Sequence, residues 1–234
     1  MNLFSAKASL AAPVVAAVML FSSLPCFAFT PLSLTDSTLN YHWMHDRVLQ
    51  TYGGEAINRL HSWRQLVQTG EMASQQERLL LVNRYFNRFR FVPDGMEGDN
   101  ADPWSTPLET LTSREGDCED LAIGKYYTLL EMGVPASQLR ILHVRLPERN
   151  GDHMVVAYYP ESGKQQAVIL DNVTDYVGTL STRTDLLPVY SFNDQGVWIV
   201  NPLNGAERPV KQRIHKWDEL RATWQNQLLP IQTS

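Results

Sequence analysis

The spacing of apolar residues changes at Gly133, and this change constrains the fold of the chain more than any other feature. Upstream, apolar side chains recur at the spacing of one helix face, whereas downstream they alternate with polar ones, as in strands. Helices are predicted within 39–68, from 74 to 89, and from near 113 or 117 to 133. Strands are predicted at 139–146, 153–159, 166–170, 189–192 and 197–200. Helices followed by an antiparallel sheet form an α+β fold.

Local signals set the boundaries of these elements. The glycine pair at 53–54 divides the first helical segment in two. Ser74 and Glu77 have the spacing of a capping box and so begin the next helix. A loop rich in Asp, Gly and Pro is expected over 93–107, and Pro135 lies just beyond the last predicted helix. No repeat or flexible linker divides the rest of the chain.

The first 28 residues are predicted to be a secretory signal peptide. They carry a single charge, Lys7, then an apolar run over 10–24 and small residues before position 29. The alternative is an uncleaved N-terminal anchor, although the apolar run is short for a membrane span. No later stretch has the length needed to cross a bilayer. We therefore expect one domain over 29–234, located outside the cytoplasm.

The charge of the chain excludes one class of partner. The formal net charge is −5, and Lys and Arg do not gather in one segment. A nucleic-acid-binding surface needs such a basic cluster, so none is predicted. Acidic residues instead gather at 94–102 and 115–120.

The cysteine content points to a reactive thiol. The chain has two cysteines, and Cys26 would leave with the signal peptide. In an oxidising compartment a single remaining cysteine, Cys118, is either a reactive thiol or a small buried apolar residue. Cys118 lies at a predicted helix start, where the helix dipole favours the thiolate and backbone N–H groups can bind an oxyanion.

His153 is the candidate base for this thiol, and Asp171 is the candidate carboxylate beside it. A hairpin centred near Ser162 pairs residues whose numbers sum to 324, as those of His153 and Asp171 do. In that register the two side chains are direct cross-strand neighbours, within ~5 Å at Cβ. A slip of one residue would place them on opposite faces of the sheet. Such a carboxylate fixes the histidine tautomer, as in a catalytic triad.

Each of these residues also has a structural reading. His153 could be a hydrogen-bonded residue at a strand start, and Asp171 could open a turn. His143 lies in the middle of a predicted strand among apolar residues, and we expect it to be packed rather than catalytic.

The carboxylates beside Cys118 oppose the formation of a thiolate. Asp117, Glu119 and Asp120 surround the cysteine, and nearby negative charge raises the pKa of a thiol. These residues could simply cap the helix and complement its dipole. Alternatively they hold a hard divalent cation such as calcium, although no EF-hand pattern is present.

The combination of motifs resembles the bacterial transglutaminase-like cysteine proteinases, and in particular the LapG-type periplasmic proteases. The motifs are Gly116-Asp117-Cys118-Glu119-Asp120-Leu121-Ala122, Gly151-Asp152-His153-Met154-Val155, Leu170-Asp171-Asn172 and Trp104-Ser105-Thr106-Pro107-Leu108-Glu109. The resemblance spans roughly residues 35–200, and no motif position departs from it.

The resemblance implies a papain/transglutaminase-like fold and a calcium-dependent endopeptidase in the periplasm. It implies a catalytic triad of Cys118, His153 and Asp171, with Asp117 and Glu119 as the carboxylates linked to Ca²⁺. The implied substrate is a large surface adhesin, cut near its N-terminus at a paired-alanine site, and its release would promote biofilm dispersal. The implied regulator is an inner-membrane receptor that senses cyclic di-GMP and binds the protease through its periplasmic domain.

Two other functions remain open from the sequence. A transglutaminase-type acyl transferase would use the same thioester chemistry and pass the acyl group to an amine. A non-catalytic periplasmic binding module would keep Cys118 as a structural residue. Trp104 could line a substrate cleft or pack at the edge of the core, and the segment after about residue 205 predicts no function.

Overall fold

The computed structural model describes residues 37–93, 103–148, 151–160 and 166–229, with side chains from Tyr41 onward. The predicted signal peptide at 1–28, the acidic segment 94–102 and the predicted turn at Ser162 lie outside the described residues. No helix in the described part of the chain is long and apolar enough to cross a membrane.

Three helices precede the motif that begins at Trp104. They are α1 (Ser37–Tyr52), α2 (Gly54–Glu71) and α3 (Gln75–Phe86). Gly53 separates the first two with a φ of 79°, a conformation that glycine adopts readily, so the predicted break is confirmed. The predicted capping box is also confirmed, because Ser74 and Glu77 exchange both of its hydrogen bonds.

Residues 103–106, the described end of the predicted loop, lead into helix α4 (Pro107–Ser113). Helix α5 (Cys118–Glu131) follows α4. The sequence reading did not predict α4, which begins with its own capping box between Thr106 and Glu109. A short parallel pair joins β1 (Arg90–Phe91), which follows α3, to β2 (Glu115–Gly116), which immediately precedes α5.

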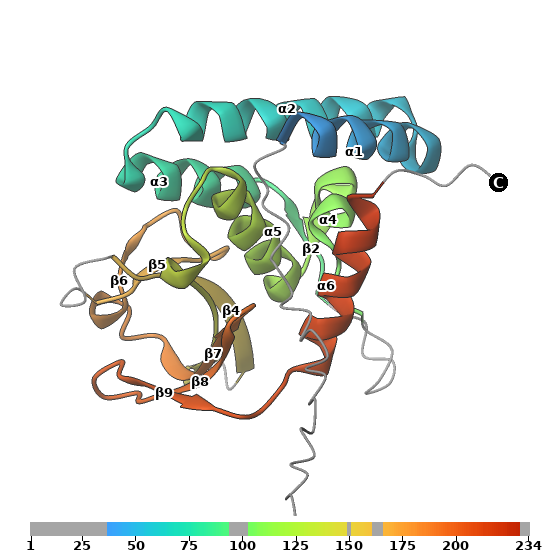
Figure 1. Ribbon diagram of the computed structural model, residues 1–234. Coiled ribbons are helices and arrows are strands. Elements are labelled where there is room, and N and C mark those ends of the chain that lie inside the picture. The colour runs from blue at the N-terminus through green and yellow to red at the C-terminus, as the bar shows by residue number, and fades with distance from the viewer. Residues whose placement is uncertain (1–36, 94–102, 149–150, 161–165, 230–234) are drawn as a thin grey trace, which may run out of the picture. The chain divides into compact units, whose positions relative to one another are not determined.

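The C-terminal half forms a seven-stranded sheet in the order β6-β5-β4-β3-β7-β8-β9, with every neighbouring pair antiparallel (Figure 1). Its strands are β3 (Leu139–Leu146), β4 (Gly151–Tyr158), β5 (Val168–Leu170), β6 (Gly178–Thr179), β7 (Leu187–Asn193), β8 (Gly196–Val200) and β9 (Glu207–Val210). The predicted α+β class is confirmed, and all five predicted strands are present. The short strand β6, strand β9 and the last helix, α6 (His215–Gln227), were not predicted.

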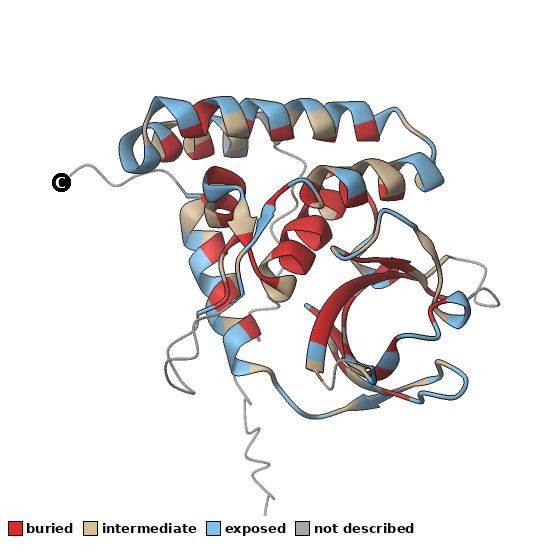
Figure 2. Cartoon of the chain, turned by 180° about the vertical axis from the view of Figure 1, so that it is seen from behind, coloured by how far each residue is buried: buried red, intermediate tan, exposed pale blue. Residues whose placement is uncertain are grey.

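Helix α5 is the centre of the main core. It packs against β4 on one side and against α3 and α4 on the other, and most of its length is buried (Figure 2). Helix α6 contributes Trp217, whose ring lies 5.7 Å from that of Tyr126 and 5.4 Å from that of Phe192. A second, smaller apolar cluster, which includes Leu142 and Val155, is separate from this core. Apolar packing therefore holds α5, which begins at Cys118, against β4.

Candidate active site

Cys118 is the first residue of α5 and lies against β4. Asp117 caps the helix, because its Oδ1 accepts a hydrogen bond from the backbone N–H of Asp120 at 3.1 Å. The side chain of Cys118 is half-buried and packs against the main core. The backbone of Met154, the residue that follows His153, lies near the sulfur and acts to lower the pKa of the thiol. The fold thus brings the predicted nucleophile to the strand that carries the predicted base.

The immediate surroundings of Cys118 favour the protonated thiol. Burial raises the pKa of the thiol, and the charge of Glu119 raises it further. The thiol also donates a hydrogen bond to Glu119 Oε2 at 3.0 Å, which has the same effect on its pKa. Burial and the adjacent carboxylate thus favour the protonated thiol, as the acidic residues around Cys118 led us to expect, and a thiolate at this helix start stays a prediction.

His153 and Asp171 form a buried pair. Nε2 of His153 lies 2.8 Å from Oδ1 of Asp171, and Asp171 is fully buried. The predicted register is wrong by two positions, since paired residues such as Val156 and Leu170 have numbers that sum to 326. A shift of two keeps each side chain on its original face, because side chains alternate with a period of two. The two side chains therefore meet diagonally instead of directly across the ladder.

Asp171 is held by more groups than the sequence predicted. Its Oδ1 also accepts a hydrogen bond from the backbone N–H of Val173 at 3.1 Å, and its Oδ2 accepts one from Nη2 of Arg183 at 2.7 Å. Burial raises the pKa of Asp171, but the hydrogen bond and charge of His153, with the bonds from Val173 and Arg183, outweigh it and hold the pKa well below its usual range. Asp171 is therefore ionised at neutral pH.

His143 occupies a packed position near this site, as expected. Its ring stacks on that of Tyr190 with centroids 4.7 Å apart, and its Nε2 lies 3.5 Å from Asp152 Oδ1. Burial lowers the pKa of His143, so the ring is neutral at physiological pH.

The predicted calcium ligands lie on either side of Cys118. Asp117 and Glu119 supply hard carboxylate oxygens of the kind that calcium prefers. Across the described residues, no three His, Cys, Asp or Glu side chains are grouped as metal ligands. Asp120 is engaged elsewhere, because its Oδ1 and Oδ2 accept bonds from the backbone N–H and Oγ of Ser105 at 2.7 and 3.1 Å. The donor chemistry of Asp117 and Glu119 therefore fits a calcium ion, and any further ligands would have to come from other groups.

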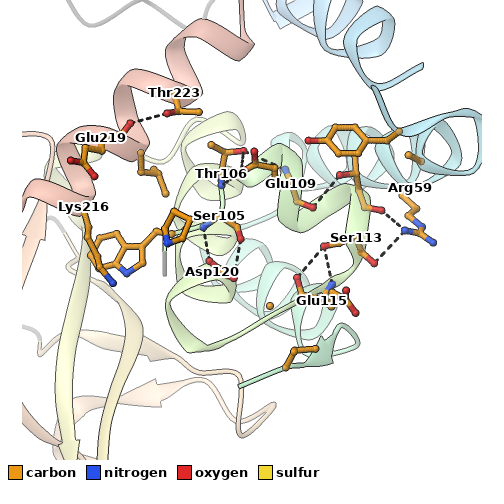
Figure 3. Close-up of a pocket in the computed structure, with 18 of the residues that line it drawn as sticks. Arg59, Ser105, Thr106, Glu109, Ser113, Glu115, Asp120, Lys216, Glu219 and Thr223 are labelled. Atoms are coloured by element: carbon orange, nitrogen blue, oxygen red, sulfur yellow. Dashed lines mark hydrogen bonds between the residues drawn. The ribbon is translucent and has the colours of Figure 1, made fainter. Parts of the chain in front are cut away.

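A cavity of about 920 Å³ lies behind the turn that precedes Cys118. It is bounded by α2, α4 and α6, and Asp120 reaches into it from α5 (Figure 3). Trp104 lines this cavity and also stacks on Phe192, with ring centroids 5.7 Å apart, so its packing at the edge of the core is confirmed, whereas its place in a substrate cleft stays a prediction. The described residues that line the cavity include neither Cys118 nor His153.

Comparison with known proteins identifies similar sequences and structures. Residues 56–201 match the model of a family described as bacterial transglutaminase-like cysteine proteinase. This region includes Cys118, His153 and Asp171, together with Asp117 and Glu119. No curated protein matches the chain.

Three solved structures of LapG from Legionella pneumophila are similar to this chain. The calcium-bound form is 34% identical with a TM-score of 0.67, and the alignment covers 76% of this chain and 96% of that one. The EGTA-treated form is 34% identical with a TM-score of 0.68, covering 79% and 97% of the two chains. A third structure is 33% identical with a TM-score of 0.68 and the same coverage. The predicted transglutaminase-like fold is thereby confirmed.

Proposed function

Because the chain belongs to the bacterial transglutaminase-like cysteine proteinases, we propose that it is an endopeptidase with Cys118 as nucleophile, His153 as base and Asp171 as the carboxylate that orients His153. One observation carries the assignment of these roles. The buried contact of 2.8 Å between His153 and Asp171 is formed on β4, the strand that packs against α5, and α5 begins at Cys118.

The contact with Asp171 assigns the two nitrogens of His153. Nε2 keeps its proton and donates a hydrogen bond to the ionised carboxylate of Asp171. Nδ1 is therefore the nitrogen that can accept a proton from the Cys118 thiol. The resulting thiolate attacks the peptide carbonyl carbon, and backbone N–H groups in the first turn of α5 stabilise the oxyanion. His153 then gives its proton to the leaving amine. Water, deprotonated by His153, hydrolyses the thioester and restores Cys118.

The two carboxylates beside Cys118 fit a requirement for calcium. Asp117 and Glu119 would hold the ion, and bound calcium would offset their negative charge next to the sulfur. Their role is supported by the effect of Glu119 on the thiol and by similarity to a structure of calcium-bound LapG.

The cellular role follows the LapG-type proteases. The proposed substrate is a large surface adhesin, cut near its N-terminus and released so that a biofilm disperses. The proposed location is the periplasm, reached through the signal peptide, and the proposed regulator is the periplasmic domain of an inner-membrane receptor for cyclic di-GMP. Similarity to LapG and the sequence of the first 28 residues support this assignment.

Incubation with candidate surface proteins, with and without calcium, tests the proposal. We expect the wild-type protein to produce fragments with new N-termini in calcium, and Cys118→Ala to produce none. Mass spectrometry of the same products in the presence of an added amine distinguishes hydrolysis from acyl transfer. A covalent amine adduct in place of a free carboxyl end would assign the chain to the acyl transferases instead.

A further inference from the structure

Arg183 is the second charged partner of Asp171. Its Nη2 lies 2.7 Å from Asp171 Oδ2, while His153 Nε2 contacts the other oxygen, Oδ1, at 2.8 Å. The exposed fractions of Arg183 and Asp171 are only 7% and 0%, so water does not screen the pair. Both oxygens of the Asp171 carboxylate thus have a hydrogen-bond partner: Oδ1 contacts the histidine and Oδ2 contacts the guanidinium.

Arg183 is itself fixed by groups that do not belong to the proposed triad. Its Nε and Nη2 donate to the two oxygens of Asp185 at 2.9 and 2.6 Å, a forked contact that sets the plane of the guanidinium. Its backbone N–H donates to Leu180 O at 3.1 Å, and its carbonyl accepts from Leu186 N at 3.0 Å. These bonds hold the side chain in place independently of His153.

The hydrogen bond from Arg183 to Oδ2 has two consequences for His153. First, it restricts rotation of the carboxyl group, so Oδ1 stays directed at Nε2. Second, it stabilises the ionised carboxylate, because a buried charge without a cationic partner tends to take up a proton. A protonated Asp171 would donate to Nε2 and leave the proton of the neutral imidazole on Nδ1, which could then no longer accept one from Cys118.

We propose that Arg183 is a positioning residue that acts through Asp171 to keep His153 in the orientation and tautomer needed to deprotonate Cys118. This inference rests on the function proposed above. It predicts that a change at Arg183 alters the hydrogen bond of His153 and the reactivity of Cys118 even when the protein remains folded.

Two measurements on the purified protein in calcium-containing buffer test this role without a known substrate. One is the rate at which iodoacetamide alkylates Cys118 at neutral pH. The other is the downfield proton NMR signal of the His153 N–H that bonds to Asp171, assigned by its loss in His153→Ala. Arg183→Met should lower the alkylation rate about 100-fold, the scale of loss for a misplaced catalytic group, and should weaken or abolish the NMR signal.

Conservative and surface variants complete the experiment. Arg183→Lys keeps the charge but cannot contact both carboxylates as a fork, so it should recover only part of the rate. Arg213→Met removes an arginine that also pairs with an aspartate, Asp218, but at the surface, and both readouts should keep wild-type values. Circular dichroism and thermal unfolding establish which variants fold.

The outcomes separate this inference from the proposed function. A folded Arg183→Met with the wild-type rate and NMR signal would overturn the positioning role. If that variant does not fold, wild-type values for both readouts in Arg183→Lys would overturn it. If wild-type protein and His153→Ala are alkylated at the same rate, it is the proposed triad that fails.

Discussion

The thiol of Cys118 and the carboxylate of Glu119 share a hydrogen bond of 3.0 Å in which the sulfur is the donor. A carboxylate that accepts from a thiol stabilises the form that cannot attack a carbonyl. Glu119 therefore favours the protonated form of the proposed nucleophile, and under the proposed function bound calcium would offset its charge.

Replacement of Glu119 with Gln should separate its effect on the thiol pKa from its proposed role in binding calcium. In EGTA, Glu119→Gln should be alkylated at Cys118 about tenfold faster than wild type at neutral pH, because the charge that raises the thiol pKa is gone. In calcium, the same variant should cleave substrate more slowly, since a ligand is lost. Glu115→Gln, which removes an exposed partner of Arg90, is the matched control. An alkylation rate in EGTA no faster than wild type would contradict the role of Glu119.

Asp117 should affect calcium dependence through its charge and helix stability through its cap. Asp117→Asn keeps a side chain that can cap α5, whereas Asp117→Ala loses the cap at a cost of about 1 kcal/mol. Both variants should lose activation by calcium, but only the alanine variant should show a lower free energy of unfolding. Activity titrations with calcium and urea unfolding measure the two effects. Full activity of the wild-type protein in excess EGTA would contradict the proposed requirement for calcium.

Lys125 should make stability depend on pH. Its Nζ is buried in α5 and donates to Oδ1 of Asn83 and of Asn87, each at 2.8 Å. Both asparagines donate to the carbonyl of Thr174, so the network ties α5 and α3 to the loop that follows Asp171. Burial lowers the pKa of Lys125 from 10.5 to about 7, although the charges of Asp171 and Asp175 oppose this shift.

The sign of the pH effect follows from this lowered pKa. Between about 7 and 10.5 the unfolded chain binds a proton at Lys125 that the folded protein does not. The free energy of unfolding should therefore rise with pH across this window, by up to about 1.4 kcal/mol per pH unit, and should be lower below it. Urea unfolding of wild type and Lys125→Met across the window isolates the effect, because the variant lacks this slope. Parallel curves for the two proteins would contradict it.

Trp217 should make α6 part of the cooperative core. Its side chain is buried against Tyr126 and Phe192, so Trp217→Ala should lower the free energy of unfolding by about 3–5 kcal/mol. Glu219→Ala, an exposed change in the same helix, is the control and should have a small effect. A Trp217→Ala protein as stable as wild type would show that the core does not depend on α6.

The elements that the sequence predicted well carry strong local signals. Strand β3 coincides with the predicted 139–146 because apolar and polar residues alternate on either side of the buried pair Ile141 and Leu142. The start of α5 was predicted from Asp117, which caps it. Strand β9 escaped prediction because Pro209 interrupts a short, largely exposed segment with no apolar alternation.

The parts of the site that the sequence could not predict depend on tertiary contacts. The register of β4 and β5 was missed by two positions because the connection between them, 159–167, is too long for turn residues to fix its centre. Arg183 reaches Asp171 from the position just after a short 3₁₀ turn, Leu180–Thr182, and no periodic pattern relates the two positions. Helix α4, in contrast, had a readable signal in Thr106, Pro107 and Glu109.

The central claim is that the sulfur of Cys118 attacks an acyl group with His153 as its base, and trapping the acyl-enzyme tests it most directly. The protein is mixed in calcium with N-acetyl-alanyl-alanine p-nitrophenyl ester, quenched with acid and measured by intact mass spectrometry. We predict a mass increase equal to one acyl group, mapped to Cys118 in wild type, absent in Cys118→Ala and strongly reduced in His153→Ala. An acyl group mapped elsewhere, or one that forms equally fast in His153→Ala, would contradict the account.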